Sequence, residues 1–386
     1  MTHQVYLDNN ATTMVAPEVI EAMAPYWSRL YGNPSSMHSF GGNVHKDVDR
    51  AREQVAALLG ASTPAEIVFT GCGSESDNLA IRGTVEALAG SRRHIVTTRV
   101  EHPAVRGICH HLQKQGYRLT ELAVDGDGAL DLDQLAQAIT PDTAIVSVMW
   151  ANNETGVVFP IEEIARIVKG RGAVFHTDAV QAAGKLPIDL SRLPIDLLSI
   201  SGHKLHAPKG IGVLYVRKGT KLVPLIMGGH QESGKRAGTE SVPLIAGLGV
   251  ACELAQRHLA EEMTRVRALR DRLQEGIMAR CKGVRVNGKR RLPNTLNVSF
   301  EYIEGESILY ALSDLGIAAS SGSACTSGSL EPSHVLRAMG VPFTAVHGSI
   351  RFSLSRYTTD EEIDYALEHL PAVVRRLRAL SPFVRS

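Results

Sequence analysis

A lysine and an aspartate, each placed directly after an apolar run, are the residues of this chain that most clearly indicate chemistry. Lys204 ends the motif Ser-Gly-His-Lys, which follows the run at residues 197–200, and Asp178 follows the run at residues 173–177. Pyridoxal phosphate (PLP) needs such a pair, because the lysine bonds to its aldehyde and the aspartate keeps its ring nitrogen protonated. Strand-end aspartates and surface lysines are also common without a cofactor, so the pair alone leaves both interpretations open.

A glycine-rich turn at residues 71–76 offers a place for a phosphate group. It follows an apolar run and opens a helical pattern, so free backbone N–H groups around Gly73 and the hydroxyl of Ser74 are available to an anion. Ser201 and His203 flank the lysine and could add further donors. An ordinary turn with a serine N-cap is the alternative, and it would be favoured if the lysine were absent.

Three more polar residues lie in or directly after strand-like runs. His102 follows the run at residues 94–98, where an imidazole could stack on a ring and move protons near pH 7, or could be an ordinary loop histidine. Asn153 closes another run and could bond a ring hydroxyl or a substrate carboxylate. Arg351, in the run at residues 349–355, could grip a substrate carboxylate through two hydrogen bonds or form a structural salt bridge.

One cysteine lies in a segment of unusual composition. Cys325 falls within residues 320–329, which are almost entirely serine, glycine and threonine and offer few side chains to a core. This composition predicts an exposed loop, and an exposed cysteine is more reactive than the buried cysteine that is usual in proteins. The five cysteines form no C-x-x-C pair, so we expect neither a disulfide framework nor a zinc site, and the other thiols to be mostly structural.

The elements that must position these residues follow an alternating pattern. Short apolar runs predict strands at residues 66–70, 94–98, 143–150, 173–177, 197–201 and 212–216. Helical patterns such as residues 161–169 separate several of them, which predicts a mainly parallel sheet covered on both faces. Ligands of such sheets lie beyond the carboxyl ends of the strands, where Asp178 and Lys204 are expected. A helical run at 243–279 then leads into a smaller α/β domain.

Composition narrows the class of protein. The chain has 386 residues, 44% hydrophobic and 21% charged, which is typical of a soluble globular protein of two or three domains. With 41 Lys and Arg against 40 Asp and Glu, no net field favours nucleic acid or an anionic membrane.

The sequence shows no signal peptide and no long apolar run, so we expect a cytoplasmic protein without a membrane segment. Neither a G-x-G-x-x-G turn for a nicotinamide cofactor nor a serine nucleophile elbow is present.

Taken together, the motifs resemble one family, the cysteine desulfurases, which are PLP enzymes of the class V aminotransferase group. The resemblance covers nearly the whole chain, from residues 6–13 through 31–36 to 355–357. Its most specific motifs are residues 201–210, 236–240 and 320–333, the last being the longer cysteine loop of the group that works with iron–sulfur scaffolds. Residues 148–153 and 228–232 and the short C-terminus are similar to the nitrogen-fixation branch.

This resemblance implies an α/β fold of the PLP-dependent transferase type, fold type I. It implies a large PLP-binding domain at residues 13–258 with a mainly parallel, seven-stranded sheet. The smaller α/β domain would combine residues 1–12 and 259–386 and carry the cysteine loop at about 320–333.

The resemblance also implies roles for individual residues. Lys204 would hold PLP covalently, Asp178 would bind its ring nitrogen, Gln181 its ring hydroxyl, and Gly73, Ser74, Ser201 and His203 its phosphate, with His102 stacked on the ring. Asn153 and Arg351 would contact the cofactor and the substrate carboxylate, and Thr239 would reach the phosphate of the neighbouring subunit in a homodimer. Ser74 stands where relatives often have threonine, and Ser241 where some have asparagine; serine keeps the hydroxyl, so the expected activity is not in doubt.

The implied reaction converts L-cysteine to L-alanine and leaves the sulfur as a persulfide on Cys325. Lys204 would remove the Cα proton, and His102 would be the acid–base partner of the substrate thiol. An iron–sulfur scaffold protein would receive the sulfur, for nitrogenase in the branch that the chain resembles; no catalytic metal is expected, although Cys325 could contact an iron–sulfur group transiently. A selenocysteine lyase or another class V enzyme is one alternative. A non-enzymatic sulfur carrier that has lost PLP is another.

Overall fold

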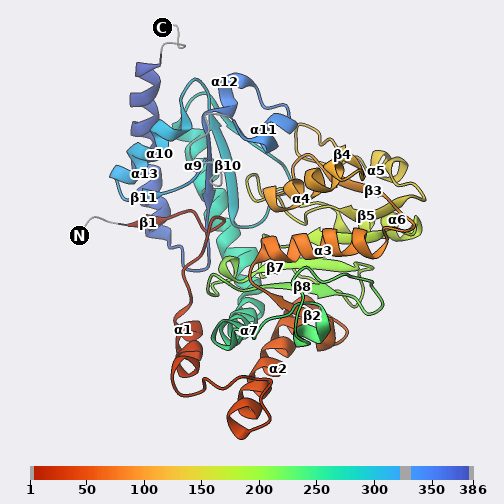
Figure 1. Ribbon diagram of the computed structural model, residues 1–386. Helices are drawn as coiled ribbons and strands as arrows, with labels where there is room; N and C mark the ends of the chain where they lie inside the picture. Colours follow the sequence, from red (N-terminus) through yellow and green to blue (C-terminus); the bar gives the residue numbers. More distant parts are fainter. Residues whose placement is uncertain (1–3, 322–331, 382–386) are drawn as a thin grey trace.

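A seven-stranded sheet forms the centre of the described residues, 4–321 and 332–381, of the computed structural model (Figure 1). Across the sheet the strands are β2 (Ile67–Thr70), β8 (Gly212–Val216), β7 (Leu197–Ser201), β6 (Val174–Asp178), β5 (Thr143–Ser147), β3 (His94–Thr98) and β4 (Arg118–Leu122). Every neighbouring pair is parallel except the two that involve β8. The mainly parallel, seven-stranded sheet expected from the sequence is therefore confirmed.

Edge strand β4 was not among the strands predicted from apolar runs. Four of its five residues are exposed or half-buried, and its sequence Arg-Leu-Thr-Glu-Leu contains two charged side chains. It pairs only with β3, on one side, at the end of the sheet. An edge strand needs less apolar surface than the central strands, which are buried along their whole length, so its pattern is weak in the sequence.

Helices cover both faces of the sheet, because alternate strand residues point to opposite sides. In β8, Val213 and Tyr215 join one core while Leu214 and Val216 join the other. One face carries α3 (Gly73–Ala87) and α4 (Pro103–Lys114). The opposite face carries α1 (Pro17–Met23), α2 (Ser39–Leu59), α5 (Leu132–Ala138), α6 (Ile161–Gly170) and α7 (Val242–Arg257). Both faces are thus removed from water, as in other largely parallel sheets.

A second core lies in the C-terminal part of the chain. Its sheet consists of β12 (Ser349–Ser353), β10 (Thr295–Phe300) and β9 (Val284–Val286). Its helices are α9 (Arg267–Arg280), α10 (Gly305–Asp314) and α13 (Asp360–Leu380), with the short α11 (His334–Ala338) and α12 (Phe343–Val346) nearby. The N-terminal strand β1 (Val5–Tyr6) pairs with β11 (Ile317–Ala318), and Val5 and Leu7 are buried in this core. The boundaries at residues 12/13 and 258/259 stay predictions, which this packing supports.

The helical run predicted at 243–279 is interrupted where the two cores meet. Helix α7 ends at Arg257, a short α8 (Leu259–Glu261) follows, and a π-helical turn at Glu262–Val266 leads into α9. Such turns insert one extra residue and change the direction in which a helix presents its side chains. The carboxyl group of Glu262 is buried there, and Lys185 of the large core opposes the rise that burial causes in its pKa.

Candidate active site

Two adjacent parallel strands bring the predicted aspartate and lysine to one edge of the sheet. Asp178 is the last residue of β6 and pairs in register with Ser199 of β7. Lys204 ends the 3-10 turn Gly202–Lys204 that directly follows β7. Because β6 and β7 are parallel, their carboxyl ends coincide, and the two side chains lie at the edge where the sequence predicted them.

A cavity of about 390 Å³ collects most of the predicted site residues. It is lined by Gly73, Ser74, His102, Asn153, Asp178, Gln181, Ser201, His203, Lys204 and Arg351. Thr239 is exposed and does not line this cavity in the single chain. Cys325 lies outside the described residues. The cavity is also lined by Asn10, Cys72 and Asp77, for which the sequence predicted no individual role.

The N-terminal segment holds the lysine in place. Lys204 Nζ donates hydrogen bonds to the carbonyl oxygens of Asn10, at 2.5 Å, and Ala11, at 2.6 Å. The same segment contacts the loop after the adjacent strand β6, since Gln181 Nε2 donates a hydrogen bond to the Asn10 carbonyl at 3.0 Å. The segment before α1 therefore forms one wall of the cavity, an arrangement that the local sequence did not predict.

Several features of this cavity fit PLP. Ser201 Oγ and Gln181 Oε1 are buried and have no hydrogen-bond partner in the described residues, although buried polar atoms normally have one. Both line the cavity, so a bound phosphate and ring hydroxyl would satisfy them. Gly73 supplies room for a close backbone approach, because a Cβ there would meet Val180 at 3.0 Å and Ser201 at 3.2 Å. Two of the polar groups expected to hold PLP thus lie at the cavity without a partner among the described residues.

Burial sets the protonation of the ionisable groups. It raises the pKa of Asp178, against the opposing effects of His102 and Lys204. It lowers the pKa of His102, which Lys204 lowers further and Asp178 opposes. Burial and the neighbouring Lys204 also lower the pKa of His203 to about 4, so that this imidazole is neutral at pH 7. His102 Nδ1 accepts the N–H of Ala104 at 3.2 Å, which places the proton of the neutral ring on Nε2.

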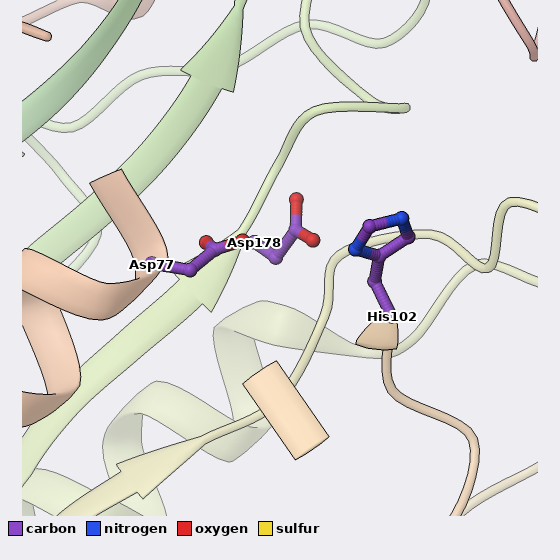
Figure 2. A group of neighbouring side chains, drawn as sticks. All are labelled: Asp77, His102 and Asp178. Carbon is purple, nitrogen blue, oxygen red and sulfur yellow. The ribbon is translucent and has the colours of Figure 1, made fainter. Parts of the chain in front are cut away.

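A second carboxyl group lies against the first. Asp77 of α3, Asp178 and His102 each place a side-chain oxygen or nitrogen within 4.8 Å of the other two (Figure 2). Figure 2 shows Asp77 reaching from α3 towards Asp178, with the His102 ring on the far side of Asp178. An aspartate in the first turns of a helix is usually a solvated group that interacts with the helix dipole, so the sequence carried no signal for this contact.

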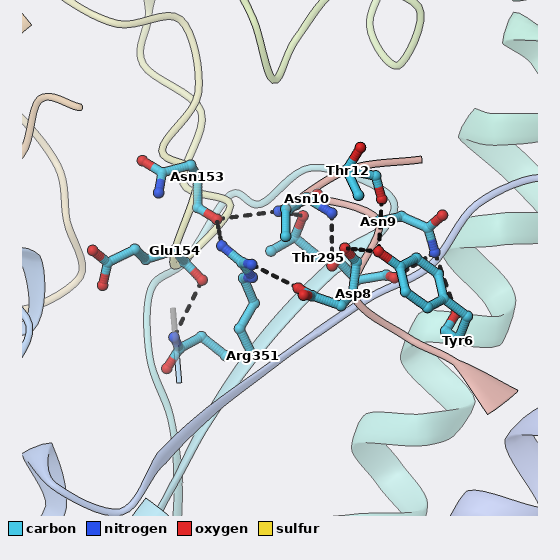
Figure 3. A network of polar contacts seen from close by, with 12 residues as sticks. Tyr6, Asp8, Asn9, Asn10, Thr12, Asn153, Glu154, Thr295 and Arg351 are labelled. Carbon is cyan, nitrogen blue, oxygen red and sulfur yellow. Dashed lines mark hydrogen bonds and ion pairs between the residues drawn. The ribbon is translucent and has the colours of Figure 1, made fainter. Parts of the chain in front are cut away.

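The guanidinium of Arg351 is held rigidly before any substrate binds (Figure 3). Its Nη2 donates to Asp8 Oδ1 at 2.7 Å, and its Nη1 donates to the Asn153 carbonyl at 2.9 Å. Asn10 Nδ2 donates to the same carbonyl at 3.2 Å. The buried Nε of Arg351 has no hydrogen-bond partner in the described residues. Arg351 therefore forms the structural ion pair that was one of the two interpretations of the sequence, and its contact with a substrate carboxylate stays a prediction.

Another carboxyl group behind the cavity was missed by the sequence reasoning. Glu101, directly before His102, is fully buried; Thr98 Oγ1 donates to its Oε1 at 2.7 Å, and the Met149 N–H donates to both carboxyl oxygens at 3.1 Å. Burial raises its pKa to about 8. The available signal was its position shortly after strand β3, next to the candidate histidine.

The family follows from comparison with known proteins. The family described as Aminotransferase class-V matches residues 5–366. This chain belongs to the class V aminotransferases. A cysteine desulfurase of Trichormus azollae is 61% identical over 98% of this chain and 95% of the relative. Cysteine desulfurase NifS of Azotobacter vinelandii is 57% identical over 98% of this chain and 94% of its own.

Two solved structures agree with the fold. A NifS-like protein superposes with a TM-score of 0.92 and 40% identity, over 97% of this chain and all of its own (100%). SspA in complex with cysteine gives a TM-score of 0.82 and 39% identity, over 92% of this chain and 100% of that chain. These comparisons confirm the resemblance to the cysteine desulfurases, the fold of a PLP-dependent class V enzyme and the expected cofactor.

Proposed function

We propose that this protein is a PLP-dependent cysteine desulfurase that converts L-cysteine to L-alanine. The observation that carries the proposal is one cavity in which Lys204, Asp178 and Arg351 come together, beside buried polar atoms that have no hydrogen-bond partner among the described residues. Relatives at about 60% identity over nearly the full length are cysteine desulfurases, which supports the same activity here.

In this proposal PLP, when bound, withdraws electrons from the substrate Cα. Lys204 Nζ would hold the cofactor and, when free of it, would take up the Cα proton. Asp178, buried at the end of β6, is placed to hold the protonated ring nitrogen. Arg351, already oriented by Asp8 and the Asn153 carbonyl, binds the substrate carboxylate. His102 Nε2, which carries the ring proton, would donate a hydrogen bond to the substrate sulfur and act as its acid–base partner.

Cys325 would receive the sulfur. Its thiolate attacks the substrate sulfur, an S–S bond forms as the C–S bond breaks, and the electron pair stays with the three-carbon product. Protonation of that product yields alanine, and the persulfide remains on Cys325. The support for Cys325 is its sequence context, together with the positions of Ser320 and Ser333 on either side of it, which both contact residues around the cavity.

The partners follow from the same comparison. Thr239 is exposed and lies outside the cavity of its own chain, which supports a homodimer in which it reaches the phosphate of the other subunit. The identity with NifS supports an iron–sulfur scaffold as sulfur acceptor and a role in nitrogen fixation. We propose a cytoplasmic location; among the described residues there is no helix with both the length and the apolar composition needed to cross a membrane.

An absorbance spectrum between 300 and 500 nm, before and after L-cysteine is added with a reductant, tests the proposal. The expected result is a cofactor band that changes on addition, with alanine and sulfide formed together. Cys325→Ala should keep the spectral change and form no persulfide. Cys72→Ser is the matched control, because Cys72 is the exposed cysteine among the described residues and lines the cavity. A colourless protein that takes up no PLP, or full sulfide release by Cys325→Ala, would contradict the proposal; turnover on selenocysteine alone would favour a lyase.

A further inference from the structure

Asp77 is a buried carboxyl group, and the part of the chain that the structure describes places no compensating cation beside it. Its side chain is 2% exposed, and its Oδ1 has no hydrogen-bond partner among the described residues. Oδ1 lies 3.6 Å from His176 Nε2, beyond hydrogen-bonding distance. The imidazole of His176 is itself satisfied, by Ser147 Oγ at 2.9 Å and Ser199 Oγ at 3.0 Å. Burial lowers the pKa of His176 to about 3, so this ring is neutral and does not balance a charge on Asp77.

The other groups that face Asp77 disfavour its ionised form. Asp178 at the end of β6, Glu101 after β3 and Cys72 before α3 all raise its pKa in addition to burial, and only Ser199 on β7 opposes them. Two carboxylates this close in a buried site do not both ionise. One proton is therefore shared by Asp77 and Asp178.

The surroundings decide which of the two carboxyl groups holds that proton. The cationic amine of Lys204 and the imidazole of His102 lower the pKa of Asp178. No cation has a corresponding effect on Asp77. A pyridinium nitrogen bound at Asp178 would favour its ionised form further. His102 lies on the far side of Asp178 from Asp77 (Figure 2), so the proton stays with Asp77 and the negative charge with Asp178, as in other carboxyl pairs with unequal environments.

We propose that protonated Asp77 donates a hydrogen bond to the carboxylate of Asp178 and so orients it towards the ring nitrogen of the cofactor. Asp77 is then a positioning residue, because it lines the cavity but acts on the ring nitrogen through Asp178. The orienting effect on the cofactor rests on the proposed PLP function. The proton shared by Asp77 and Asp178 does not, because it is already present in the protein without cofactor. No oxidant or co-reactant is needed, since the proton stays within the pair.

Infrared spectroscopy of the cofactor-free protein tests the proton directly. With isotope-labelled aspartate, the wild-type protein at pH 7 should show a protonated buried carboxyl band that is absent from Asp77→Asn. If that band is missing from the wild type, or if it persists in Asp77→Asn, the assignment to Asp77 is wrong. This readout does not require PLP to bind, so it separates a failure of the present proposal from a failure of the proposed function.

The affinity for PLP tests the hydrogen bond. Asp77→Asn keeps an N–H donor and should bind PLP within about threefold of the wild type, whereas Asp77→Leu lacks the donor and should bind about tenfold or more weakly. Thr84→Val is the matched control, because Thr84 Oγ1 is another buried polar atom of α3 without a hydrogen-bond partner and does not line the cavity. It should leave PLP affinity unchanged. Equal affinity of Asp77→Asn and Asp77→Leu would overturn the proposed role, and should the leucine variant fail to fold, the infrared result still decides it.

Discussion

The hydroxyl of Ser333 donates a hydrogen bond to Glu154 Oε2, across 179 positions of the sequence. Both residues are buried, and Ser333 Oγ also accepts the N–H groups of Val335 and Leu336 as the N-cap of α11. At the other end of the predicted cysteine loop, Ser320 pairs with Arg351 through two backbone hydrogen bonds. The chain on both sides of Cys325 is thus attached to residues that neighbour or line the cavity.

Ser333→Ala should weaken this attachment. It removes a helix cap and leaves the buried carboxyl group of Glu154 without its donor, and we expect a loss of about 2 kcal/mol in the free energy of unfolding. Persulfide formation on Cys325, measured by rapid alkylation, should slow while PLP affinity stays unchanged. Ser333→Thr keeps the hydroxyl and serves as the control. An equal effect of both variants on persulfide formation would show that the hydrogen bond to Glu154 is not responsible.

Ser201→Ala should separate cofactor binding from stability. Because Ser201 Oγ is buried without a partner, its removal should leave the cofactor-free protein as stable as the wild type or more stable by about 1 kcal/mol. The same change should weaken PLP binding about tenfold or more, since it removes a hydrogen bond to a charged phosphate. Thr177→Val removes another buried hydroxyl without a partner, one that does not line the cavity, and should leave PLP affinity unaltered. Thermal unfolding without PLP and a PLP titration provide the two measurements.

Arg351→Lys should raise KM for cysteine about 10- to 100-fold, with a smaller change in kcat. Lysine keeps the charge, but its single ammonium group cannot bind Asp8, the Asn153 carbonyl and a substrate carboxylate in the geometry of a guanidinium. Charge-assisted hydrogen bonds contribute about 1.5–3 kcal/mol each. Steady-state kinetics with cysteine provide the measurement, and Arg285→Lys on strand β9, at the other edge of the same three-stranded sheet, is the control. An unchanged KM would remove Arg351 from the substrate site.

Glu101→Gln should change how stability depends on pH. The pKa of Glu101 is raised from 4.5 to about 8 in the folded protein, so below pH 4.5 both states hold the proton and the stabilisation is complete. Between these values only the folded state holds it, and stability falls by about 1.4 kcal/mol per pH unit as the pH rises, until the contribution is lost above pH 8.

The measurement for Glu101 is the difference in unfolding midpoint between wild type and Glu101→Gln from pH 5 to 8. The difference removes the contributions of other titrating groups, such as His176, whose lowered pKa acts in the opposite direction. The advantage of the wild type should shrink steadily with rising pH. A difference that does not vary with pH would show that Glu101 has an ordinary pKa in the folded protein.

The predicted strand ends were recognisable because their physics is local. A buried strand needs a continuous apolar run, and the residue after it carries a polar group that the core cannot accept. Asp178 and Lys204 follow such runs, and the alternation of strands with helices implied that parallel neighbours place them at one edge. The fold class, the edge at which the site lies and the lysine–aspartate pair could therefore be derived from the sequence.

The sequence by itself determined which residue types are available for the site. The tertiary structure decided which of those residues are buried and which lack a hydrogen-bond or ionic partner. Asp77 looks like any acidic residue near the start of a helix until α3 packs it against Asp178. The carbonyl groups of Asn10 and Ala11 accept hydrogen bonds from Lys204 only because the N-terminal segment forms a wall of the cavity. That segment is placed there by the pairing of β1 with β11, more than three hundred residues away in the sequence. Burial and long-range pairing are properties of the whole packed chain, and a local pattern of residues does not contain them.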